Sequence, residues 1–429
     1  MNISSRIPRF YKMSVEERKQ HIIERYGLDE EATNQLMNEI SLPEETADKM
    51  IENVIGTFGL PLGLGLNFLI DGKDYVVPMA VEEPSIIASA SFIAKIVREA
   101  GGFKTEATDR VMIGQIQVVG CPDFEEAKAT ILKEKDMLIQ AANDAYPTLV
   151  ARGGGAEDLD VRIINDGDSE FTKMLVVHLY VNTCDAMGAN IINTMAESLA
   201  PVVEHLTKGK VYLRILSNYA DKCLAKATCV IPPRLLDTDG FTGEEVRDGV
   251  VLAYEFADSD PYRAVTHNKG IMNGIDPVII ATGNDWRAVE AGAHAYAART
   301  GQYRSMTKWS VDEAGNLVGE LELPMSLGIV GGASRVHPMA KVAYDLLNID
   351  SAAELAKVVV SVGLAQNLGA IRALATDGIQ KGHMRLHSRS VAMAAGATGE
   401  LVDTIADKLV EAKEIRVGYA EELLKEYTK

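Results

Sequence analysis

The chain has 429 residues and a formal net charge of −18. This length is enough for two or three domains with a large core, and the composition is that of an ordinary globular protein. The negative charge argues against nucleic acid and anionic membranes as partners. An anionic substrate would therefore need a local cluster of Arg and Lys.

The sequence gives no sign of a signal peptide or a membrane span. The first residues, MNISSRIPRFYKMS, lack an apolar core, and no run reaches the ~20 apolar residues that a span needs. The uncharged run from Val358 to Ile371 indicates a buried helix instead.

The four cysteines lack paired metal-ligand spacing, so we expect core thiols in a reducing cytoplasm. They are Cys121, Cys184, Cys223 and Cys229.

The first hundred residues predict helices around one hairpin. Ser14 begins a capping box whose helix should end near Gly27, and a short helix should follow Asp29. A third helix is expected from Pro43 to Gly56. Asp71-Gly72 predicts a two-residue hairpin turn. The second strand should lead into a helix that begins at Pro84 and ends at Gly101-Gly102.

Residues 111–219 predict a unit of their own, in the order βαββαβ of the ferredoxin-like fold. The expected elements are a strand at 111–119, a helix at 123–143, strands at 159–164 and 173–182, a helix at 186–206 and a strand at 211–217. We therefore expect an α+β protein in which this small domain is inserted into a large, mainly helical domain formed by residues 1–110 and 220–377. Residues 378–429 form a C-terminal helical segment.

Two glycine-containing segments of the small domain are candidate ligand contacts. The run Asp185-Ala186-Met187-Gly188-Ala189-Asn190 joins a strand to a helix N-terminus, which suits a phosphate or another polar group. Gly153-Gly154-Gly155 lies upstream. Gly63-Leu64-Gly65 lacks the third glycine and the helix of a dinucleotide fingerprint, which argues against a Rossmann domain.

The second half of the large domain predicts mixed strands and helices. After a strand at 222–231 we expect a helix at 243–257, a helix at 286–299, paired strands near 306–311 and 317–323, and helices near 338–347 and 352–375.

The segment from Asp260 to Ala295 carries the strongest chemical signal. Lys269 lies in a turn-like run, His267-Asn268-Lys269-Gly270, and Asp285 follows a short apolar stretch. A lysine held near a carboxylate keeps its charge and can stabilise an oxyanion on a carbonyl. The alternative is that Asp285 only caps the helix that begins at Trp286.

Two further groups have a chemical and a structural interpretation. Adjacent Glu82 and Glu83 can supply a general acid if one is buried, or can simply favour a helix N-terminus. His383 and His387 are four residues apart, which is metal-ligand spacing on a helix. Because the glutamate of H-E-x-x-H and a third ligand are missing, we expect no metal, and a single histidine acting as a proton donor or a surface pair fits better.

Together these motifs resemble one family, the hydroxymethylglutaryl-CoA (HMG-CoA) reductases, in the soluble class II found in bacteria and archaea. Each short motif is weak alone, but seven in order are specific. They are Glu52-Asn53-Val54-Ile55-Gly56, Val81-Glu82-Glu83-Pro84-Ser85, Asp185-Ala186-Met187-Gly188-Ala189-Asn190, Asp260-Pro261-Tyr262-Arg263, His267-Asn268-Lys269-Gly270, Gly283-Asn284-Asp285-Trp286-Arg287 and Gly382-His383-Met384.

The resemblance implies reduction of the HMG-CoA thioester to mevalonate in two hydride steps, with release of coenzyme A. Lys269 would stabilise the oxyanion, and Asp285 would hold that lysine. Glu83 would protonate the aldehyde-level oxygen, and His383 would protonate the departing thiolate. Contacts to the nicotinamide cofactor would come from Asp185, Met187, Gly188, Asn190 and Asn218. Contacts to the hydroxymethylglutaryl group would come from Ser85, Arg263, Asn273 and Gln366.

The resemblance also implies a cytoplasmic homodimer with active sites between subunits. The large domain would bind the CoA thioester, the small domain the dinucleotide, and residues 378–429 would form a flap. NADH-preferring members tend to carry an aspartate at the position of Tyr146. Without it, Thr148 or Arg152 could bond a ribose phosphate, so we expect NADPH rather than NADH.

Three alternatives stay open from the sequence. The same enzyme could oxidise mevalonate as a carbon source. A homologue that binds CoA thioesters or nucleotides without catalysis could keep this scaffold. A hydrolase using Asp285 and His383 is a further option, although no G-x-S-x-G motif supports it.

Overall fold

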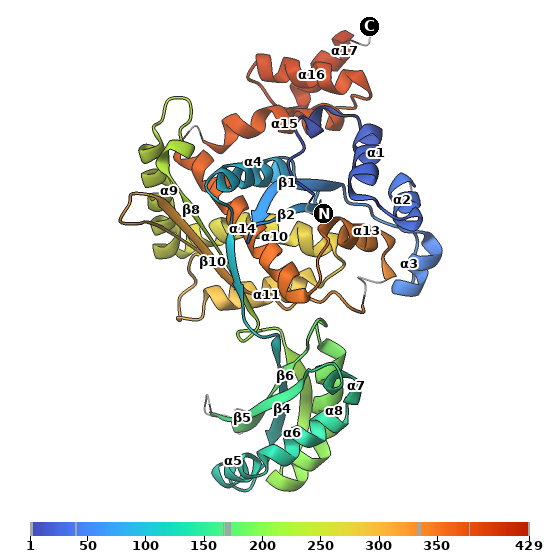
Figure 1. The fold of residues 1–429 in the computed structure, drawn as a ribbon, viewed down its shortest axis with the longest axis vertical. Helices are drawn as coiled ribbons and strands as arrows, with labels where there is room; N and C mark the ends of the chain where they lie inside the picture. Colours follow the sequence, from blue (N-terminus) through green and yellow to red (C-terminus); the bar gives the residue numbers. More distant parts are fainter. Residues whose placement is uncertain are drawn as a thin grey trace.

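The computed structural model describes residues 3–38, 41–165, 167, 173–332, 336–376 and 378–427, without the side chains of 379–386. Figure 1 shows three parts along the long axis of this mixed α/β protein. A central body lies between a sheet-containing unit at one end and a helical cluster holding the C-terminus at the other.

The N-terminal part of the body confirms the predicted first helices and hairpin. Ser14 forms the capping box of α1, and Gly27 ends that helix in the left-handed conformation. Asp71 and Gly72 both have positive φ, as a two-residue hairpin turn requires. The elements are α1 (Val15–Tyr26), α2 (Glu30–Met37), α3 (Glu44–Met50), β1 (Leu62–Ile70), β2 (Lys73–Ala80), α4 (Ile86–Glu99) and β3 (Lys104–Ala107).

Two helix ends in this part differ from the prediction. Helix α3 stops at Met50, because Ile51 is extended and Asn53 has a left-handed φ of 58°. Helix α4 begins only at Ile86, and its N-cap Ser85 has a φ of 75°, so Pro84 precedes the helix. The short strand β3, which pairs with β8, was not predicted.

The small unit, residues 111–217, forms a four-stranded antiparallel sheet in the order β5-β6-β4-β7. Helices α5, α6 and α8 pack on one face over an apolar core. The helix expected at 123–143 is two helices, because the chain bends at Glu134 while backbone hydrogen bonds continue across the bend. The elements are β4 (Val111–Val119), α5 (Phe124–Lys133), α6 (Lys135–Asp144), α7 (Pro147–Val150), β5 (Gly155–Asn165), β6 (Lys173–Asn182), α8 (Ala189–Thr207) and β7 (Lys210–Ser217).

Arg110 ties the small unit to the central body. Its buried guanidinium donates to the carbonyl oxygens of Met325 at 2.8 Å and Leu327 at 2.5 Å. Its own carbonyl accepts from the backbone N–H of Thr183, at the end of β6. Hydrogen bonds from a charged donor are stronger and more directional than neutral ones, so Arg110 holds the connection at a defined angle.

The rest of the body is a second four-stranded antiparallel sheet, β3-β8-β10-β9, with helices around it. Strands β8 and β10 pair in continuous register from Leu317↔Ile231 to Pro324↔Leu224. The elements are β8 (Leu224–Ile231), α9 (Gly243–Ser259), α10 (Pro261–Ala281), α11 (Trp286–Ala297), β9 (Thr307–Val311), β10 (Leu317–Pro324), α13 (Pro338–Leu347) and α14 (Ala352–Ala375).

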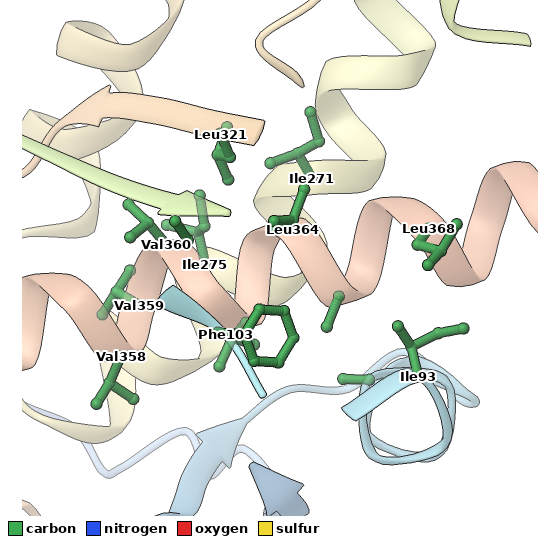
Figure 2. Close-up of a cluster of buried hydrophobic side chains, with 14 of the residues drawn as sticks. Ile93, Phe103, Ile271, Ile275, Leu321, Val358, Val359, Val360, Leu364 and Leu368 are labelled. Carbon is green, nitrogen blue, oxygen red and sulfur yellow. The ribbon is translucent and has the colours of Figure 1, made fainter. Parts of the chain in front are cut away.

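Helix α14 is the centre of the main core. Figure 2 shows its apolar side chains packed against α4, α10 and β10. By length and composition alone this helix could cross a membrane, but 67% of its apolar window is buried inside the protein. Burial inside the protein explains why this helix is apolar on all sides, and the sequence predicted a buried helix here.

The turn predicted at His267–Gly270 was wrong, because residues 261–281 form one continuous helix, α10. Asp260 caps it and Pro261 occupies the first turn. The glycines that indicated a turn serve packing instead. A Cβ on Gly274 would lie 2.7 Å from the Cβ of Gln366, so glycine lets α10 approach α14 closely.

The C-terminal cluster has its own small core. It consists of α15 (Ile379–Ala394), α16 (Glu400–Glu411) and α17 (Val417–Tyr427). Ile405 and Leu409 of α16 are buried against residues of the other two helices. In Figure 1 this cluster lies at the opposite end of the body from the small unit.

The close packing of α10 on α14 predicts different effects at two glycines of one helix. A Cβ on Gly270 would meet nothing outside its own helix within 4 Å, whereas a Cβ on Gly274 would be crowded. Alanine adds about 1 kcal/mol of helix propensity at either position. We therefore expect Gly274→Ala to be less stable than Gly270→Ala by about 1–3 kcal/mol in urea titrations. Equal stability of the two variants would contradict the packing argument.

Candidate functional site

One face of α10 lines a cavity of about 800 Å³, here called the α10 cavity. Residues three or four apart share a helix face, and Arg263, Thr266, His267, Gly270 and Asn273 follow that spacing. The other walls come from the start of α4, from α14, and from residues of α9 and α15. They include Glu83, Pro84, Ile86, Ser89, Gln366, Asn367, Gly369 and Ala370. The volume is within the range of small-molecule sites.

Lys269 and Glu83 form an ion pair at the wall of this cavity. Lys269 Nζ donates to Glu83 Oε2 at 2.9 Å, and the two side chains are 61% and 44% exposed. An exposed pair of this kind contributes only about 0–1 kcal/mol to stability. Stability therefore does not account for the pair, whereas a cation and a carboxyl beside an open cavity can both act on a bound carbonyl compound.

Two polar side chains, one that follows the wall residues Glu83 and Pro84 in sequence and one in the lining of the cavity, have a buried atom without a partner among the described residues. Ser85 Oγ and Gln366 Oε1 are buried without a hydrogen bond among the described residues. Buried polar groups normally have partners, so such atoms are suited to bonding a ligand. Ser85 is also held with a left-handed φ, a conformation that is uncommon for residues other than glycine.

His267 is the most buried ionisable group of this cavity. Only 2% of it is exposed, and burial, together with the nearby charge of Arg263, lowers its pKa to about 4. The ring is therefore neutral at physiological pH. The sequence predicts no separate role for His267, because the run around it is typical of a turn. In a helix, the spacing of these residues places His267 on the same face as Arg263 and Asn273.

A second cavity, of about 1030 Å³, lies at the N-terminus of α8 and is here called the α8 cavity. It brings together most of the residues predicted for cofactor binding. They are Tyr146, Thr148, Arg152, Asp185, Met187, Gly188 and Asn190. Gly328, Gly331 and Gly332 also line it, although the sequence indicated only a glycine-rich connection there. The described lining does not include Asn218, whose backbone carbonyl packs against Gly292 of α11.

Glycine and helix geometry prepare the α8 cavity for an anionic ligand. Gly188 has a φ of 96°, and a Cβ there would lie 2.4 Å from a methyl carbon of Thr183. Glycine therefore allows the strand to turn tightly into α8. No described side chain caps the N-terminus of this 19-residue helix, so its free N–H groups and positive dipole end face the cavity.

Asp185 connects the α8 cavity with the body. Its Oδ1 accepts from the N–H of Ala352, at the start of α14, at 2.8 Å. Its carbonyl oxygen accepts from the N–H of Ile329 at 2.9 Å. The aspartate thereby fixes the turn before α8 at the junction between small unit and body.

The structure does not bring Asp285 to Lys269. Asp285 lines the α8 cavity, where it caps α11 through the N–H of Ala288 and lies 3.5 Å from Arg287. Lys269 lines the α10 cavity and pairs with Glu83. From Lys269 to the end of α10 the helix rises about 18 Å, at 1.5 Å per residue. Asp285 thus caps α11, and the described residues show no hydrogen bond or ion pair between its carboxylate and Lys269 of the same chain.

His383 belongs to α15, but its side chain lies outside the described residues. His387, one turn later on that helix, lines the α10 cavity. Helix α15 therefore reaches the α10 cavity.

The described residues contain no group of three or more His, Cys, Asp or Glu side chains placed to hold a metal ion. All four cysteines are free thiols, and burial raises the pKa of each. Cys184 lines the α8 cavity, and the other three are buried.

Comparisons with known proteins agree on one family. Residues 14–388 match the family described as hydroxymethylglutaryl-coenzyme A reductase. The chain is 53% identical to 3-hydroxy-3-methylglutaryl-coenzyme A reductase of Archaeoglobus fulgidus over 98% of this chain and 94% of that one. It is 34% identical to a probable reductase of the same name from Borreliella burgdorferi, over 86% of this chain and 83% of that one.

Solved structures are similar over nearly the whole chain. The reductase of Streptococcus pneumoniae superposes with a TM-score of 0.83 and 43% identity, covering 97% of this chain and 99% of that one. A second structure, of the class II enzyme from the same organism bound to NADPH in open conformations, gives a TM-score of 0.82 and 44% identity over 86% of this chain and 99% of that one. The chain belongs to the hydroxymethylglutaryl-coenzyme A reductase family, whose NAD(P)H-dependent members reduce HMG-CoA in the mevalonate pathway.

Proposed function

We propose that this protein reduces HMG-CoA to mevalonate in active sites shared between two subunits. One observation carries the proposal: the residues expected to act together are divided between two cavities of one chain. Glu83, Lys269 and Arg263 line the α10 cavity, while Asp285 and Asp185 line the α8 cavity. In a two-fold dimer the α10 cavity of one subunit can face the α8 cavity of the other, which yields two equivalent complete sites.

This arrangement assigns a part to each segment of the chain. Residues 1–110 and 220–377 form the large domain, which binds the thioester in the α10 cavity. Residues 111–219 form the small ferredoxin-like domain, which binds the dinucleotide. Residues 378–429 form a flap that carries His383. The position of His387 at the α10 cavity supports the proposal that this flap extends to the substrate site. We place the protein in the cytoplasm.

The α10 cavity suits a substrate that carries a carboxylate and a thioester. The guanidinium of Arg263 can bond a carboxylate through two parallel N–H groups. Asn273 lines the same wall, and the buried, unpaired atoms of Ser85 and Gln366 can bond further oxygens of the hydroxymethylglutaryl group.

The catalytic roles follow from charge. Lys269 stabilises the negative charge that forms on the thioester oxygen and later on the aldehyde oxygen. Glu83, 2.9 Å from that ammonium group, protonates the aldehyde-level oxygen. The partner's Asp285 holds the lysine across the interface. His383 protonates the thiolate of coenzyme A as it leaves.

The α8 cavity fits the nicotinamide cofactor that supplies the hydride. Its volume of about 1030 Å³, the free N-terminus of α8 and the close turn at Gly188 support this assignment. Asp185, Met187 and Asn190 line it, and Asn218 is proposed as a further cofactor contact. Tyr146 stands in the lining where a carboxylate would repel a ribose phosphate, and Thr148 and Arg152 can bond that phosphate. We therefore propose NADPH rather than NADH as the preferred cofactor.

Removal of the lysine tests the mechanism. In a Lys269→Ala variant we expect HMG-CoA-dependent oxidation of NADPH to fall on the order of a hundredfold or more, because the oxyanion loses its cation. The measurement is the absorbance of the reduced nicotinamide. Lys226→Ala, which breaks a comparable ion pair with Glu320 at 2.8 Å, should keep full activity. Near-normal turnover of Lys269→Ala would rule out this mechanism.

Mixed dimers test the shared site. Lys269→Ala and Asp285→Ala subunits carrying different tags are co-expressed, and the heterodimers are isolated through both tags. One site then combines both substitutions and the other has neither, so we expect about half of the wild-type activity from two inactive parents. If both residues instead served one site within a chain, the heterodimer would be as inactive as its parents.

A charge change at Tyr146 tests the cofactor assignment. A Tyr146→Asp side chain would repel the ribose phosphate of NADPH and could bond the ribose hydroxyls of NADH. We expect the ratio of kcat/KM for NADPH to that for NADH to fall on the order of tenfold or more. An unchanged ratio would show that Tyr146 does not contact this part of the cofactor.

A further inference from the structure

His267 is the end of a buried hydrogen-bond chain that reaches the α10 cavity. Its Nε2 lies 2.9 Å from Thr307 Oγ1 and 3.0 Å from Asn367 Nδ2. Asn367 Oδ1 in turn accepts from Trp309 Nε1 at 2.8 Å. Thr307 Oγ1 also lies 3.0 Å from Asn367 Oδ1, so its one hydroxyl hydrogen is shared between that oxygen and His267 Nε2. All four side chains are at most 2% exposed. They come from α10, β9 and α14, so the chain links three elements beneath the cavity.

The indole of Trp309 determines the tautomer of His267. An indole N–H can only donate, so the Asn367 atom facing it is the amide oxygen. The amide nitrogen therefore faces His267, and because it too can only donate, Nε2 of His267 is the acceptor. In a neutral imidazole the other nitrogen then carries the proton. We assign His267 as the Nδ1–H tautomer on these grounds.

That Nδ1–H has no acceptor in the part of the chain that the structure describes. Nδ1 of His267 is buried without a hydrogen-bond partner among the described residues. His267 lines the α10 cavity, together with Gln366, whose Oε1 also lacks a partner. Leaving a buried donor unpaired carries a free-energy cost. The Nδ1–H of His267 is therefore suited to donate to an oxygen of a ligand in the α10 cavity, which would remove that cost.

We propose that His267 binds the substrate, donating its Nδ1–H to an oxygen of the hydroxymethylglutaryl group. The inference rests on the proposed placement of that group in the α10 cavity. As a neutral donor, His267 recognises an oxygen without adding a third positive charge beside Arg263 and Lys269. The chain from Trp309 acts as a positioning device, since it fixes both the proton and the orientation of the ring.

Two substitutions separate substrate binding from a merely structural role. The amide nitrogen of His267→Asn can occupy the place of Nδ1 but leaves Asn367 without its acceptor. The amide of His267→Gln can occupy the place of Nε2 and keeps the buried chain, but leaves nothing at Nδ1. Stability and substrate recognition should therefore rank the two variants in opposite orders.

We expect His267→Gln to be the more stable variant in thermal unfolding and the poorer enzyme. Its kcat/KM for HMG-CoA should fall on the order of tenfold below that of His267→Asn, with the KM for NADPH unchanged in both. If kcat/KM instead follows stability, or is equal in the two variants, His267 only supports the fold and the proposal is overturned.

Wild-type protein provides a test that does not depend on the folding of the variants. In protein labelled with ¹⁵N-histidine, the Nδ1–H signal of the neutral His267 should shift when HMG-CoA is added and should stay in place with NADPH alone. No shift at saturating HMG-CoA would overturn the proposal.

A substitution at the guanidinium distinguishes this failure from failure of the proposed site. If Arg263→Gln raises the KM for HMG-CoA while His267→Gln does not, the cavity is the substrate site and only the role of His267 is wrong. If neither variant changes that KM, the placement of the substrate itself is wrong.

Discussion

The length of one rigid helix determines how this protein can work. Helix α10 runs unbroken from Pro261 to Ala281, and it rises about 18 Å from Lys269 to its end, before the turn that leads to Asp285 at the cap of α11. A loop in this place could have folded back and brought the two side chains together. The helix cannot, so the cation and the carboxylate belong to different cavities. The proposed site, which uses both, therefore combines residues of two chains.

The position of α10 depends in turn on the packing of α14. Helix α14 is apolar on nearly every side and fills the centre of the body, where Ile271 and Ile275 of α10 lie against it (Figure 2). The absence of a side chain at Gly274 brings the two helix backbones close together. Both helices also contribute polar residues to the α10 cavity, so the contact that builds the core also sets the width of the site.

Local sequence patterns correctly predicted those elements that depend on interactions between residues close together in the sequence. The capping box at Ser14, the hairpin turn at Asp71-Gly72 and the buried helix α14 were all recognisable, because each depends on neighbours in sequence. Asn268, Gly270, Asn273 and Gly274 also favour turns locally, and here the prediction failed. Packing against α14 and the cap at Asp260 outweigh their propensity, and no local pattern reports such tertiary contacts. The same error hid His267, whose place on a cavity-lining face exists only if the helix does. Glu83 and Lys269 were predicted from their motifs, but their direct pairing required the structure.

The connection at Arg110 determines what kind of motion the small unit can make. In Figure 1 this unit extends from the body on its connecting segments, and no described helix or strand of it packs extensively on the body. Directional bonds from one guanidinium to two carbonyl oxygens set its angle. Turning the unit would thus exchange a few polar contacts with water and expose little apolar surface. Such a rotation would carry almost no change in heat capacity, so its enthalpy would stay nearly constant with temperature, unlike the enthalpy of unfolding either core.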